Sequence, residues 1–226
     1  MCSSDLLPTP ADSPHTLLVW HTSPVKRVED MRARETLIGT LAPGSTPTVT
    51  IGLYNEVFRT RMRPVLGYTG LPDVMLAIER GEVEGYASMP FDTLRHSYKA
   101  QFTSGLIRVL AHSGDTPLPD LPDAPSARSF AANSEDRALL DLGTASSKMT
   151  FAYMMGPGVP RERVEAMRRA FMAALADPEL LEEARRRDMA VRPISAERVS
   201  ELIHAAFATP APVVARLQAI YERLSR

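Results

Sequence analysis

The chain has 226 residues, of which 44% are hydrophobic and 23% charged, and its formal net charge is −1. A chain of this length and composition buries a sizeable core, as one large domain or two small ones. The near-zero charge argues against nucleic acid as a partner, and no apolar run reaches the roughly 20 residues of a membrane helix, so we expect no direct membrane insertion.

The opening residues, 1–6, read Met-Cys-Ser-Ser-Asp-Leu, which is what the end of a common sequencing adapter would encode. We therefore interpret residues 1–16 as an irregular and partly non-native leader; a native polar leader is the alternative. Apart from Cys2 the sequence contains no cysteine, so no disulfide or zinc–thiolate site is expected. The start also lacks the pattern of a secretory signal, so we expect no signal peptide in this chain.

Short apolar runs alternate with helical patterns along the first two thirds of the chain. The strands are predicted at 17–20, 36–39, 62–66, 83–88 and 106–111. Helices are predicted behind Pro47 and at 71–80, 91–99 and 135–142. This alternation indicates an α/β layer with a largely parallel sheet.

The last third of the chain is almost entirely helical in pattern. A strand is predicted at 149–155, and only 190–193 offers another. The helices are predicted at 161–176, 178–187, 196–208 and 212–224, each beginning near a proline or a Ser, Asp or Thr cap. Because amphipathic helices need an apolar surface to cover, and this part supplies little sheet, we expect some of their apolar faces to be exposed.

Eight short sequence segments follow one another in a definite order along the chain. They are Pro24–Met31, Glu35–Thr40, Pro43-Gly44-Ser45, Gly67–Gly70, Ala77–Gly85, Ile107–Leu110, Leu121–Pro125 and Gly156–Pro160. Each string is common by itself, but the ordered series resembles the substrate-binding receptors of the tripartite tricarboxylate transporter family. The similarity covers about residues 17–224.

The resemblance implies an α/β fold of the periplasmic-binding-protein kind (type II), with two domains joined by crossing strands. Residues 17–149 would hold a hinge strand and the complete second domain. Residues 150–226 would hold the return strand and the C-terminal helical part of the first domain. The N-terminal half of the first domain would be absent, so the resemblance implies an N-terminally truncated chain.

The resemblance also implies a function. Family members are periplasmic, bind small carboxylates between their domains and deliver them to membrane components of the transporter. It implies a non-catalytic receptor without a cofactor. An enzyme on a similar two-domain scaffold and a ligand-sensing module are the alternatives, although the sequence offers no convincing nucleophile, acid/base pair or fused signalling domain.

The segment 40–46 is the strongest candidate for a binding site. It leads from a predicted strand into the start of a helix, where unpaired N–H groups and the positive end of the helix dipole favour an anion. Gly44 lets the backbone approach a ligand, and Thr40, Ser45 and Thr46 add hydroxyl groups. A capped helix with a tight turn and no ligand is the alternative.

Further candidates lie outside this segment. Tyr68, Thr69 and Gly70 could present a second set of donors, or form a plain strand-to-helix turn. Ser88 could line the cleft, and Trp20 could touch the ligand, although a lone tryptophan is more often part of the core. The histidines show no metal-ligand spacing, so no metal site is predicted.

Overall fold

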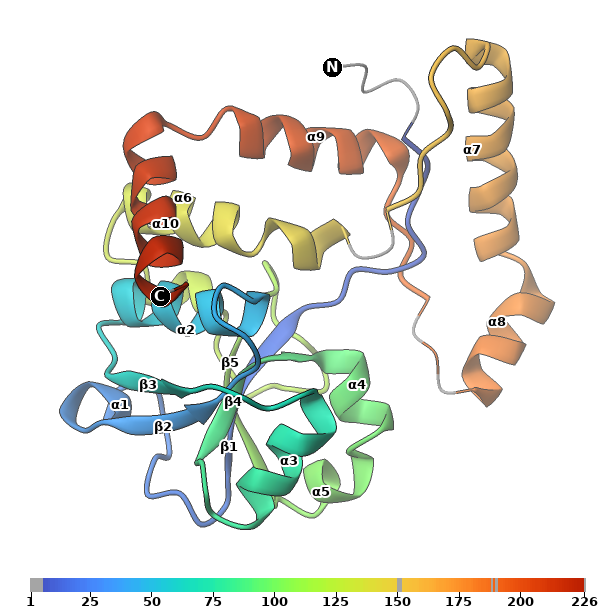
Figure 1. Cartoon of the computed structure of the whole chain (residues 1–226). Helices are drawn as coiled ribbons and strands as arrows, with labels where there is room; N and C mark the ends of the chain where they lie inside the picture. Colours follow the sequence, from blue (N-terminus) through green and yellow to red (C-terminus); the bar gives the residue numbers. More distant parts are fainter. Residues whose placement is uncertain (1–5, 150–151, 188, 190, 226) are drawn as a thin grey trace. The chain divides into compact units, whose positions relative to one another are not determined.

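The computed structural model describes residues 6–149, 152–187, 189 and 191–225. These residues form two compact units (Figure 1). Unit 1 comprises residues 1–13 and 145–208, and unit 2 comprises residues 14–144 and 209–226.

Unit 2 is built on one five-stranded sheet. Its strands are β1 (His15–Trp20), β2 (Thr36–Gly39), β3 (Met62–Val65), β4 (Gly85–Pro90) and β5 (Ile107–His112), in the order β3-β2-β4-β1-β5. β2 pairs in parallel with β3 and β4, but β1 lies between β4 and β5 and is antiparallel to both. The prediction of a largely parallel sheet is therefore wrong: the sheet is mixed, because β1 enters it in the reverse direction.

Helices cover both faces of this sheet (Figure 1). They are α1 (Asp30–Ala33), α2 (Thr46–Phe58), α3 (Leu71–Glu79), α4 (Phe91–His96), α5 (Lys99–Thr103), α6 (Ser134–Gly143) and α10 (Ala211–Leu224), with a short 3-10 helix at Ala127–Phe130. The predicted helix at 91–99 is divided into α4 and α5, because the backbone at Tyr98 leaves the helical conformation (φ −119°, ψ 26°).

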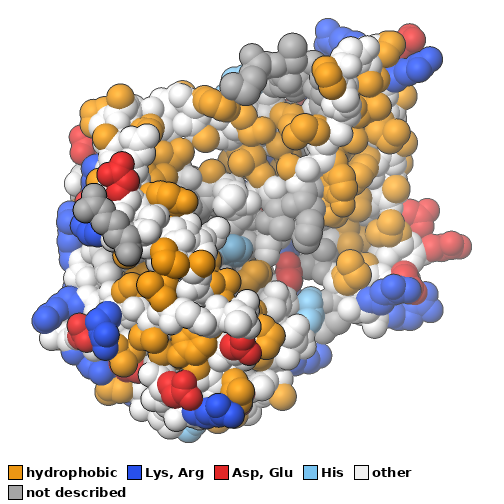
Figure 2. Space-filling view, in the orientation of Figure 1, with side chains coloured by type: hydrophobic (Ala, Val, Ile, Leu, Met, Phe, Trp, Pro, Cys, Tyr) orange, Lys and Arg blue, Asp and Glu red, His pale blue; other side chains and the backbone are white. Residues whose placement is uncertain are grey.

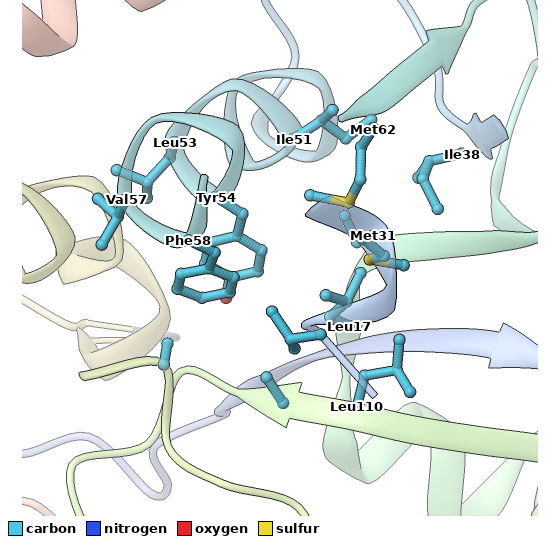
Figure 3. Packing of buried hydrophobic residues seen from close by; sticks show 14 of the residues in the cluster. Leu17, Met31, Ile38, Ile51, Leu53, Tyr54, Val57, Phe58, Met62 and Leu110 are labelled. Atoms are coloured by element: carbon cyan, nitrogen blue, oxygen red, sulfur yellow. The ribbon is translucent and has the colours of Figure 1, made fainter. Parts of the chain in front are cut away.

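The main hydrophobic core lies between α2 and the sheet (Figure 3). Tyr54 and Phe58 of α2 stack with their ring centroids 4.4 Å apart, and they pack in one buried cluster with Leu17 of β1 and Ile38 of β2. A second cluster on the other face joins Leu18 of β1 to α3 and α4. Because successive residues of β1 point to opposite faces, this strand contributes to both clusters.

The C-terminal helix α10 belongs to unit 2, whereas the sequence placed all of 150–226 with the first domain. Val213 and Ile220 are buried in the main core, beside α2. Gly52 of α2 permits this approach, since a Cβ there would lie 2.6 Å from Ile220 and 2.5 Å from Leu224. The predicted boundary differs because the amphipathic pattern of 212–224 shows that it needs a partner surface but does not show which one.

Unit 1 contains α7 (Arg161–Leu175), α8 (Pro178–Arg186), α9 (Ala196–Phe207) and a 3-10 helix at Ala145–Met149. Asp177 caps α8 and Ser195 caps α9, each accepting from backbone N–H groups of the first turn. Arginines at the end of α8 pair with glutamates one turn earlier, which gives the mixed charges visible over this helix in Figure 2. The side chains of Arg185, Arg186 and Arg187 are thus charged surface groups of the helix end.

The residues before β1 are not an irregular leader throughout, as the sequence suggested for 1–16. Leu6 forms an isolated β-bridge with Met154, and Thr9 forms another with Ile194. His15 and Thr16 already belong to β1. Backbone pairing with residues distant in the sequence therefore orders the segment 6–16. A local sequence pattern does not reveal such pairing.

The two strands predicted for the last third are wrong where the structure describes them. Around 149–155 the described residues form the end of a 3-10 helix and the single bridge at Met154; Thr150 and Phe151 lie outside the described residues. Around 190–193 the chain is irregular up to the bridge at Ile194, and Ala190 also lies outside them.

Unit 1 exposes large apolar side chains, as the shortage of sheet led us to expect. They are Tyr153, Met154, Met167, Met172, Leu180, Met189 and Phe207. Within the described part of the chain, no helix is long and apolar enough to cross a membrane.

Candidate functional site

The candidate site of unit 2 lies where β2, β3 and β4 end. Because these strands are parallel, their carboxyl ends meet at one edge of the sheet, which we call the carboxyl edge; it carries the turns 40–46 and 66–70 and the end of β4 at 88–90. Backbone bonds join the first two turns: Thr40 N–H donates to Val65 O at 2.9 Å, and Gly67 N–H donates to Leu41 O at 3.2 Å. The structure thus brings together two segments that the sequence predicted separately.

The turn before α2 presents the start of a helix at this edge. Gly44 has φ +70°, a left-handed conformation that glycine adopts without strain. Ser45 is the extended N-cap residue, and no side chain caps the first turn of α2. Thr46 begins the helix and is exposed. The first N–H groups and the positive dipole end of α2 are therefore directed to this edge, which suits an anion.

A side-chain network centred on Thr48 holds this turn. Thr48 Oγ1 donates to the carbonyl oxygen of Ala42 at 2.9 Å. It also contacts Thr40 Oγ1 at 2.8 Å and Ser45 Oγ at 3.0 Å. Since the single Thr48 proton is used on Ala42, both neighbouring hydroxyls donate to Thr48. Thr40 is fully buried, so it positions the turn and does not face solvent.

Sequence reasoning missed Thr48, although the Ser45-x-x-Thr48 spacing is the one at which an N-cap side chain meets the first helical turn. The sequence had assigned ligand-binding hydroxyls to Thr40 and Ser45. In the structure both hydroxyls are tied to Thr48, which leaves the exposed Thr46 and the backbone N–H groups as the available donors.

The second turn contributes a helix start of its own. Gly67 has φ +105°, and Gly70 is the extended N-cap residue of α3. Thr69 is exposed, but its hydroxyl donates to the Asp73 carboxylate. Tyr68 is half-buried; burial raises the pKa of its phenol, and the nearby Glu82 carboxylate raises it further. Tyr68 therefore stays protonated and keeps its donor.

Ser88 and His15 form a polar pair at the same edge. Ser88 is buried, and its Oγ lies 2.8 Å from His15 Nδ1. His15 belongs to the carboxyl edge because β1 is antiparallel, so that its first residue lies opposite Pro90 at the end of β4. Burial lowers the pKa of His15 below its ordinary value, which keeps the imidazole neutral at pH 7.

Trp20 does not join the other predicted site residues. It ends β1 opposite Ile107, the first residue of β5, and so lies at the other edge of the sheet. It is buried in the second cluster with Ile78 and Tyr86. Trp20 is thus part of the core, which was the alternative that the sequence left open.

The C-terminal end of α10 packs against the Gly44 turn. A Cβ at position 44 would lie 2.8 Å from Ser225 Oγ and 3.0 Å from Tyr221 Oη. Glycine is therefore required there by both conformation and space. Among the described residues, no group of three or more His, Cys, Asp or Glu side chains could hold a metal ion.

No protein-family model matches the chain, and the search of curated proteins gives no match. Solved structures with the same fold are found nonetheless. A TctC solute binding protein from Polaromonas superimposes with a TM-score of 0.67 at 14% identity, over 99% of this chain and 72% of its own length.

Two similar structures contain ligands. A protein of R. palustris with adipate has a TM-score of 0.60 at 19% identity, over 95% of this chain and 69% of its own. MatC from Rhodopseudomonas palustris with bound malate has a TM-score of 0.56 at 16% identity, over 98% of this chain and 69% of its own. The chain thus has the α/β fold of solute-binding proteins, as predicted. Within that class it is the fold of the TctC-type proteins.

Proposed function

We propose that this chain is a solute-binding protein that captures a small carboxylate, as the extracytoplasmic component of a tripartite tricarboxylate-type transporter. It would act in the periplasm, without catalysis, and deliver its ligand to membrane components of that system. The observation that carries the proposal is the carboxyl edge, where the uncapped start of α2 and the turn before α3 are joined by backbone bonds.

The donors at this edge fit a carboxylate. The start of α2 supplies backbone N–H groups and a partial positive charge, and the exposed Thr46 adds a hydroxyl. These groups bind an anion without a cationic side chain, so the site favours release as well as capture. The adipate and malate in two similar structures agree with a dicarboxylate as the ligand class.

The test is calorimetric titration of the chain with malate, adipate and citrate, alongside a neutral sugar and an amine of similar size. We expect saturable binding of at least one carboxylate and none of the sugar or the amine. Binding of only the sugar or the amine, or of nothing in the panel, would overturn the proposal.

A further inference from the structure

His15 is held at the carboxyl edge from both sides of its strand. On one side it lies opposite Pro90 of β4. On the other, its N–H donates to Ser113 Oγ at 2.9 Å, and its carbonyl accepts from Ser113 N–H at 2.8 Å. The backbone that carries the imidazole is therefore fixed, although His15 itself is only half-buried.

Two β-bulges flank β1 next to this residue. Between the pairs Thr16–Met89 and Leu18–Tyr86, β4 advances three residues while β1 advances two. β5 likewise has one extra residue opposite the step from Leu17 to Leu18. Bulges re-aim side chains and are common beside functional sites. Here the bulge in β4 includes Ser88, the residue that meets the His15 ring.

The hydrogen bond between this pair determines which ring nitrogen carries the proton. The Ser88 hydroxyl is buried and lies within hydrogen-bond distance of His15 Nδ1. A buried hydroxyl is best satisfied when it donates, and Nδ1 can accept only if the proton is on Nε2. Ser88 Oγ–H therefore donates to His15 Nδ1. The donor of the pair that remains for a ligand is His15 Nε2–H.

His15 also lies on the correct face of the sheet. Alternation along β1 puts it on the same face as Leu17 and Val19, which pack in the core beneath α2. α2 begins at the carboxyl edge and covers that face, as Figure 3 shows for Leu17 and the α2 residues Tyr54 and Phe58. The imidazole and the start of α2 thus share one edge and one face.

We propose that His15 is a ligand-contacting residue of this site, whose neutral imidazole donates Nε2–H to a carboxylate, and that Ser88 is the positioning residue that fixes the tautomer. This inference rests on the proposed function and deepens it, since it adds a donor at β1 to the two turns. A ligand with two carboxylates suits the arrangement: one meets the start of α2 and the other meets His15.

The experiment compares variants of the chain by calorimetric titration with malate and adipate. We expect His15→Leu to raise the Kd about tenfold, because a hydrogen bond to a charged group is lost. His15→Gln should recover most of the affinity, since its amide nitrogen can replace Nε2. Ser88→Ala should raise the Kd by about threefold. His21→Leu, at the exposed residue that follows the other end of β1, is the matched control and should bind as the parent does.

Nitrogen NMR of the histidine rings supplies a measurement that a purely structural role would not change. The free chain should show His15 with its proton on Nε2, and malate should shift the Nε2 signal; the tautomer preference should weaken in Ser88→Ala. If the parent chain binds neither dicarboxylate, the proposed function fails. If it binds while His15→Leu keeps the parent Kd and the Nε2 signal does not move, only the present inference is overturned.

Discussion

Thr48 is the residue that organises the turn before α2. Its hydroxyl bonds to the Ala42 carbonyl and to the hydroxyls of Thr40 and Ser45, and it is fully buried. Three polar groups therefore depend on one side chain. The helix start can be presented to an anion only while this turn keeps its shape.

Replacing Thr48 by valine keeps the volume but removes the hydroxyl. We expect Thr48→Val to lower the free energy of unfolding by about 2 kcal/mol, because buried polar groups lose their partner. Carboxylate affinity should fall with it. Urea denaturation and titration with malate measure the two effects.

Thr50→Val is the matched control on the same helix. Thr50 is also buried, but its hydroxyl bonds only to the Thr46 carbonyl one turn earlier, so its loss should cost less than about 1 kcal/mol and leave binding unchanged. Equal effects of the two substitutions would show that Thr48 has no special role.

Individual residues differ in how far the sequence can predict them. The turn at 40–46 could be predicted, because Gly44 and the prolines at 43 and 47 encode it locally. His15 could not, because its position depends on β1 running antiparallel between two strands that follow it in the sequence. Trp20 was predicted at the site because the local sequence does not show in which direction β1 runs in the sheet.

At the scale of elements, α10 is fastened to unit 2 by a charge cluster as well as by its apolar face. Arg216 donates to Asp136 of α6 at 2.8 Å and to Glu56 of α2 at 3.3 Å. Asp136 is 1% exposed, so its carboxylate depends on this cation. The hydrogen bond to Asp136 is the main cause that raises the pKa of Arg216, although burial opposes it.

Removing the Arg216 cation should leave the buried Asp136 carboxylate without its main partner. We expect Arg216→Met to lower the free energy of unfolding by about 3 kcal/mol, since Arg59 lies 3.8 Å from Asp136 and compensates only weakly. Arg198→Met, which breaks an exposed pair with Glu201 within one helix, should change it by less than about 0.5 kcal/mol. Equal urea midpoints for the two variants would contradict this assignment.

Most elements could be predicted from their patterns, but their partners could not. The strands at 36–39 and 62–66 and the helix at 71–80 are close to β2, β3 and α3, because each follows a local apolar period and ends at glycine or proline. β4 lies at Gly85–Pro90 and not at 83–88, and its register against β1 shifts at a bulge. Such shifts arise from pairing with β1 and leave no local trace.

At the scale of the whole molecule, the chain combines a five-stranded mixed sheet in unit 2 with helices in unit 1. The fold is shared with structures of which this chain spans 69% to 72%. Sequence identity of 14% to 19% with these structures leaves the ligand to be argued from the residues themselves. The carboxyl edge of unit 2, with its helix starts and the His15–Ser88 pair, is the part of the chain that we propose binds the ligand.

The most direct test of this account is to map malate onto the backbone amides of the chain by NMR titration. The account predicts saturable shifts concentrated at Thr46, Thr48 and Gly67–Gly70, with a further shift at His15. Saturable binding whose shifts cluster elsewhere, such as at the segment 26–32 with its three basic and two acidic residues, with no change at the carboxyl edge, would contradict it.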